Sequence, residues 1–133
     1  MLELASRYGN GPTYLKDIAQ SQDISEKYLW HLIAPLKAAG LIRSSRGAHG
    51  GYSLAKNPAQ INLSQVLRVL EGSLGIVECV ENNSICNRNH FCVTRDIWKE
   101  ISDKLEGVLS SVTLAQMLER QKDKGKELLA YNI

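Results

Sequence analysis

Three cysteines close together offer the most distinctive chemistry in the chain. Cys79, Cys86 and Cys92 are the only cysteines, and six and then five residues separate them. An odd number of thiols argues against a disulfide framework, whereas thiolates are soft donors that suit iron–sulfur clusters or zinc. Zinc sites usually use closer Cys pairs. We therefore expect a segment that binds metal or senses redox state, with structurally inert thiols as the alternative.

A second chemical signal is a long stretch without acidic residues. Residues 27–70 contain neither Asp nor Glu. The basic and titratable side chains of this stretch are Lys27, His31, Lys37, Arg43, Arg46, His49, Lys56 and Arg68. Such a stretch suits a polyanionic partner, most simply nucleic acid. The alternative is a chance gap in a chain whose net charge is only +2.

The elements that must position these side chains form a winged helix. Thr13 is expected to cap a helix over 14–21, and after a three-residue turn Ser25 caps a second helix. Two strands, 41–45 and 51–55, then flank a basic, glycine-rich tip. A helix-turn-helix followed at once by a hairpin is a winged helix. The predicted fold class is therefore mainly α with a small β-wing.

Beyond the wing, a further helix is predicted over 62–71, and the longest helix, 93–112, follows the cysteines. Its apolar stripe recurs at helical spacing: Ile97, Trp98, Ile101, Leu105, Val108, Leu109 and Val112. We favour pairing of this stripe with a second copy, because winged-helix proteins usually read two half-sites. Packing against its own domain is the alternative. Thr113 is expected to cap a shorter helix that ends at Leu118, before a frayed, charged tail.

These elements divide the chain into four parts. We expect a winged DNA-binding domain (1–74), a loop that carries the cysteines and is called the cysteine segment (75–92), dimerisation helices (93–118) and a charged C-terminal tail (119–133). No apolar run reaches the roughly 20 residues of a membrane span, and the N-terminus has no secretory signal pattern. We therefore expect a cytoplasmic protein without a membrane partner. No nucleophile–base pair or cofactor-binding glycine motif indicates an enzyme.

The residues also resemble those of a known family. The stretches 24–29 (ISEKYL), 36–42 (LKAAGLI) and 46–54 (RGAHGGYSL), together with the three cysteines, are similar to the Rrf2 family of bacterial transcription regulators. The similarity is greatest to its iron–sulfur-binding IscR branch. This resemblance implies a homodimeric repressor that binds palindromic double-stranded promoter DNA. It further implies a [2Fe–2S] cluster on Cys79, Cys86 and Cys92, cluster donor proteins as partners, and control of iron–sulfur cluster biogenesis genes.

Two positions depart from the IscR pattern. The histidine expected three residues after the last cysteine is Arg95 here, and a guanidinium has no lone pair to donate. The glutamate that filters target sequences in that branch is Trp30. The fourth cluster ligand is therefore open, with His90, Glu78 or a segment upstream of Met1 as candidates.

The expected DNA contacts lie on the second helix of the helix-turn-helix and on the wing. They are Ser25, Lys27, Tyr28, Trp30, His31 and Lys37 on the helix, and Arg46 and His49 on the wing. Arg46 is the strongest candidate, because a narrow minor groove attracts arginine. Three other functions fit parts of the sequence: a nitric-oxide sensor of the NsrR type, a cluster-free thiol regulator, or a small iron–sulfur electron carrier.

Overall fold

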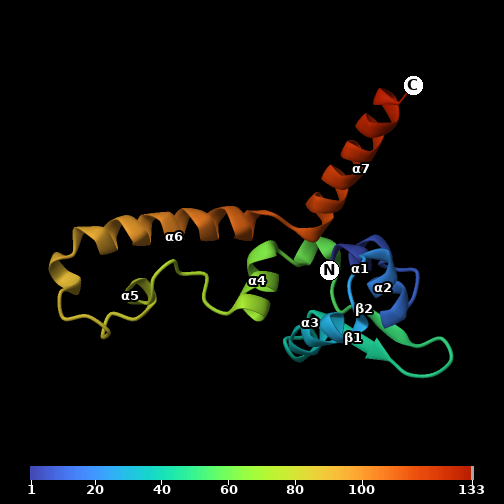
Figure 1. The fold of residues 1–133 in the computed structure, drawn as a ribbon, viewed down its shortest axis with the longest axis horizontal. Coiled ribbons are helices and arrows are strands. Elements are labelled where there is room, and N and C mark those ends of the chain that lie inside the picture. Colours follow the sequence, from blue (N-terminus) through green and yellow to red (C-terminus); the bar gives the residue numbers. More distant parts are fainter. Residues whose placement is uncertain (133) are drawn as a thin grey trace.

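The computed structural model describes residues 1–132 of the chain, and its N-terminal half is a winged helix (Figure 1). Helices α1 (Leu2–Ser6), α2 (Leu15–Ser21) and α3 (Glu26–Ala38) precede an antiparallel hairpin of β1 (Ile42–Ser45) and β2 (Gly51–Leu54). The predicted fold class, mainly α with a small β-wing, is confirmed.

Helix α3 forms as its sequence predicts. The side chain of Ser25 accepts a hydrogen bond from the backbone N–H of Tyr28 and caps the first turn. Leu29, Ile33 and Leu36 are buried at helical spacing. They join one hydrophobic core with residues from α1, α2, both strands and α7, and Leu54, Ile61 and Leu114 are its most deeply buried large side chains.

Thr13 has a different role from the predicted helix cap. Tyr14 is the N-cap of α2, and the backbone of Thr13 pairs with Tyr52 of β2, with N···O distances of 2.9 and 2.8 Å. Thr13 therefore extends the wing sheet one residue before the helix cap, and no side chain caps α2. Gly51 permits this close approach, because a Cβ there would lie 2.4 Å from the Thr13 carbonyl oxygen, and its φ is +134°.

The second half of the chain is helical and extended. After a 3-10 turn, η1 (Pro58–Gln60), α4 (Leu63–Glu71) begins with a capping box between Asn62 and Gln65. The predicted cysteine loop contains a short helix, α5 (Glu78–Glu81), and a second 3-10 turn, η2 (Asn89–Phe91). Helix α6 (Val93–Ser111) follows as a long rod that packs on α4 and α5 (Figure 1).

The predicted end of the last helix is wrong. Helix α7 runs over Leu114–Tyr131, so the charged residues expected to fray continue the helix past Leu118. A capping box of Thr113 and Gln116 starts α7. Its first turns pack on α1 and η1, and its C-terminal part projects away from the winged domain (Figure 1). None of the helices described within residues 1–132 is long and apolar enough to cross a membrane.

Candidate DNA interface and cysteine segment

The predicted DNA-contacting side chains of α3 lie on its exposed surface. Lys27, His31 and Lys37 are exposed, as are Tyr28 and Trp30 with 56% and 53% of their surfaces accessible. Neither aromatic ring is therefore a core residue. Ser25 is exposed at the start of the helix, where its side chain is already engaged as the cap. Helix α3 thus buries one apolar face and presents a basic, aromatic one.

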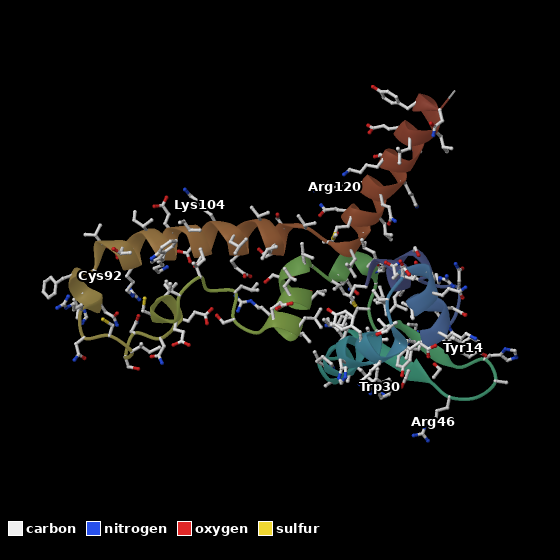
Figure 2. The ribbon with its side chains drawn as sticks, in the orientation of Figure 1. Tyr14, Trp30, Arg46, Cys92, Lys104 and Arg120 are labelled. Carbon is white, nitrogen blue, oxygen red and sulfur yellow. The ribbon has the colours of Figure 1, made fainter. Side chains whose placement is uncertain are left out.

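The wing places Arg46 and His49 at an exposed tip beyond the hairpin. In Figure 2, Trp30 of α3 and Arg46 of the wing lie at the same lower edge of the molecule. The hydroxyl of Tyr14 donates a hydrogen bond to the carbonyl oxygen of Ala48, which ties the wing tip to the start of α2. Neither residue has an unusual spacing or charge, so no sequence pattern indicates this contact.

The acid-free stretch does not form one uniformly free basic surface. The Arg68 guanidinium pairs with Glu106 of α6, with an Nη2···Oε2 distance of 3.0 Å. Nε of Arg43 donates to Ser53 Oγ across the hairpin at 3.2 Å. The predicted contact with a polyanion therefore depends on the exposed basic side chains of α3 and the wing tip.

The three cysteines lie on one segment but do not converge. Cys79 is half-buried in α5, Cys86 is exposed, and Cys92 is half-buried as the N-cap of α6. Within residues 1–132, no three His, Cys, Asp or Glu side chains gather as a metal site. His90 is exposed on η2. Because a [2Fe–2S] cluster needs four ligands around one core, this arrangement does not fit the cluster as it stands.

Arg95 holds the first part of this segment against α6. Its Nε donates to the carbonyl oxygen of Cys79 at 3.0 Å, and its guanidinium also donates to the side-chain oxygen of Asn83. Arg95 is the residue at the expected position of a fourth ligand. In this chain the position organises the backbone of the segment and supplies no metal donor.

Helix α6 has two different apolar faces. Trp98, Leu109 and Val112 are half-buried, and α6 packs on α4 and α5. The other apolar residues remain exposed at steps of three and four: Val93, Ile97, Ile101, Leu105 and Val108. No residue of α6 is fully buried. Packing within the subunit therefore accounts for only part of the predicted stripe and leaves a continuous apolar face uncovered.

A helix-turn-helix with an exposed basic helix and a basic wing defines a winged-helix DNA-binding protein. Over residues 1–120 the sequence matches the Rrf2 family, described as an iron-dependent transcriptional regulator. The chain belongs to this family, whose named members among its relatives are transcription regulators and not enzymes.

Similar proteins come from two branches. The chain is 43% identical to the transcriptional regulator CymR of Bacillus subtilis over 88% of this chain and 80% of that protein. The structure of B. subtilis CymR, described as the global cysteine regulator, aligns with a TM-score of 0.75 at 41% identity, covering 90% and 87% of the two chains. The structure of T. potens IscR aligns with a TM-score of 0.76 at 42% identity, covering 92% and 80%. Overall similarity therefore does not separate an IscR-like from a CymR-like function.

Proposed function

We propose that this transcription regulator binds palindromic double-stranded promoter DNA as a homodimer, and that the cysteine segment, residues 75–92, receives its signal. The observation that carries the proposal is the exposed basic, aromatic face of α3 next to the Arg46 wing. The first turns of α3 would enter the major groove, where Lys27 and His31 reach base edges or phosphates. Arg46 would enter the adjacent minor groove. Binding to promoter DNA gives the protein a cytoplasmic site of action.

The exposed apolar face of α6 supports the homodimer. Five large apolar residues, Val93, Ile97, Ile101, Leu105 and Val108, are between 39% and 74% exposed along one side of this helix. A second copy of α6 would bury the same residues in a two-fold interface, which presents the same patch from each subunit. Two winged domains held in this way could read the two halves of a palindrome.

A protein–DNA titration tests the DNA-binding part of the proposal. Selection from random duplexes at one salt concentration should yield a palindromic site. Arg46→Ala should weaken binding to it by about 1–3 kcal/mol. Lys104→Ala is the matched control, because Lys104 pairs with Glu100 within α6 and lies away from α3 and the wing (Figure 2). Equal affinities for the wild type and Arg46→Ala would remove Arg46 from the interface.

The nature of the signal has two candidates. A [2Fe–2S] cluster, as in the IscR branch, would use Cys79, Cys86 and Cys92, would be supplied by cluster donor proteins and would link the protein to iron–sulfur cluster biogenesis genes. It would require the segment to rearrange, because the three thiols do not converge as folded here. A cluster-free thiol response is favoured by that same geometry and by the Arg95 contacts.

Anaerobic purification distinguishes these two candidates. A cluster gives visible absorption with equal amounts of iron and sulfide, and Cys86→Ala should abolish both. A colourless protein without iron or sulfide, whose operator affinity changes on thiol oxidation, would support the cluster-free alternative. An operator affinity that changes neither with cluster loading nor with thiol oxidation would refute the assignment of the cysteine segment as the sensor.

A further inference from the structure

A polar contact joins the winged domain to α6. Ser64 and Arg68 lie one turn apart on α4, and both donate to the carboxylate of Glu106 on α6. The Ser64 Oγ···Oε1 distance is 2.6 Å, and the Arg68 Nη2···Oε2 distance is 3.0 Å. Each carboxylate oxygen therefore has its own donor from α4. We call these three residues the α4–α6 contact.

The α4–α6 contact differs from the other ion pairs in the described part of the chain. The remaining pairs join residues three or four apart in sequence, whereas Arg68 and Glu106 come from two separate helices. Ser64 is also only 4% exposed, and its hydroxyl accepts a hydrogen bond from Arg68 Nε at 3.4 Å while it donates to Glu106. The hydrogen bond from Ser64 and then that from Arg68 lower the pKa of Glu106, so the carboxylate is ionised near neutral pH.

A second attachment fixes the far end of the same helix. The N–H of Leu63 donates to the carbonyl of Val112, and the N–H of Leu114 donates to the carbonyl of Ile61, both at 2.9 Å. Glu106 lies six residues before Val112, which is about 9 Å along the helix axis. Two attachments separated along a rigid rod fix its direction, whereas the terminal one alone would leave a pivot.

We propose that the α4–α6 contact sets the angle between the winged domain and α6, and thereby selects the half-site spacing that the dimer reads. This inference rests on the proposed function as a dimeric reader of palindromes. In such a dimer the two recognition helices must reach successive major-groove faces about 34 Å apart. Since α6 forms the proposed dimer interface and α4 belongs to the winged domain, the angle between them determines this separation. None of the three residues in this contact is a proposed DNA contact, so its effect would be on spacing and not on the reading of bases.

Titration against spacing variants tests the inference. The full chain is titrated with palindromes whose half-sites are moved apart or together in single base-pair steps, at one salt concentration. For the wild type, one spacing should bind best. We compare the affinity for the best spacing with the affinity for the neighbouring spacings. Glu106→Ala should reduce the ratio of these affinities by about fivefold or more. Glu100→Ala is the matched control, because it removes the same charge from α6 but breaks only a pair with Lys104 on the same helix.

The outcomes separate this inference from the proposed function. If Glu106→Ala is a folded dimer with the wild-type ratio, the α4–α6 contact does not select spacing, and the proposed function stands. If the wild type binds a palindrome no better than one half-site, the proposed function fails and the inference with it. Glu106→Gln covers the case in which the alanine variant does not fold. It keeps an oxygen for Ser64 but loses the ion pair, so its ratio should lie below the wild-type value, and an unchanged ratio would again overturn the inference.

Discussion

Replacing Ile101 by aspartate tests the proposed dimer at the centre of the exposed α6 face. Ile101 is 41% exposed in the single chain. Full burial of such a side chain is worth about 1.5–3 kcal/mol, so roughly 1 kcal/mol per copy remains to be gained on dimerisation. Because each subunit of a two-fold dimer contributes one Ile101, the two residues together stabilise the dimer by about 2 kcal/mol. The introduced carboxylates add a desolvation cost of several kcal/mol if they are buried.

The combined loss is at least about 4 kcal/mol, which raises the dimer Kd about a thousandfold. Sedimentation velocity over a range of protein concentrations measures this change directly. DNA affinity should fall with it, because two half-sites are no longer bound by one particle. The fold should survive, since no residue of α6 is fully buried.

Gly107→Asp is the matched control for the added charge. A Cβ at Gly107 meets no atom within 4 Å, and this position lies away from the apolar stripe on the helix wheel. It should therefore leave the dimer intact. A dimer that survives Ile101→Asp would show that this face of α6 is not the subunit interface, and the assembly proposed here would be wrong.

Three further predictions concern the wing, the cysteine segment and Glu106. Tyr14→Phe removes the hydroxyl that donates to the wing-tip carbonyl, and it should weaken operator binding by up to about 1.5 kcal/mol without changing the dimer. An unchanged affinity in a gel-shift titration would show that DNA binding by the wing does not need this hydrogen bond. Alanine at Cys79, Cys86 and Cys92 together should give a folded dimer with one fixed operator affinity, measured before and after iron loading or thiol oxidation. The partners of Glu106 lower its pKa, so the carboxylate should stabilise the fold above the ordinary carboxyl range and lose that contribution as the pH falls through its depressed pKa. Glu106→Gln should accordingly reduce the pH dependence of urea unfolding in acid, and an identical pH profile would contradict this assignment.

Local sequence signals predicted most of the winged helix because they depend on neighbouring residues. Ser25 caps α3 through a backbone group three residues away, and glycines permit the hairpin turn. Thr13 was misassigned because its competing partner, Tyr52, lies 39 residues further along the chain. Contacts between distant residues also decide the role of Arg68, which lies in the acid-free stretch that indicated a polyanionic partner. Its partner Glu106 is 38 residues away, and no pattern in the sequence indicates that pairing.

The error at α7 has a different cause. The stretch after Leu118 was expected to fray because its charged residues offer little apolar surface to bury. Helix propensity favours the opposite result, since Glu, Arg, Gln, Lys and Leu are all strong helix formers and no proline interrupts them. The capping box at Thr113 starts the helix, and packing of its first turns on α1 and η1 stabilises it. An amphipathic stripe is therefore needed where a helix packs, but not along its whole length.

The cysteine segment shows why proximity in sequence does not establish a binding site. The seven-residue step from Cys79 to Cys86 can span more than about 20 Å when extended, so spacing alone leaves the sulfur positions almost free. Bringing three such points together costs chain entropy, and a bound ligand or a new covalent bond must offset that cost. Arg95 already restrains the first part of the segment against α6, and Cys92 is the N-cap of that helix. A change that orders the rest of the cysteine segment would therefore be transmitted to the N-terminal end of α6. The α4–α6 contact lies toward the C-terminal end of the same helix. The same rigid helix connects the proposed sensor with the angle of the winged domain, so this route requires no direct contact between the cysteines and DNA.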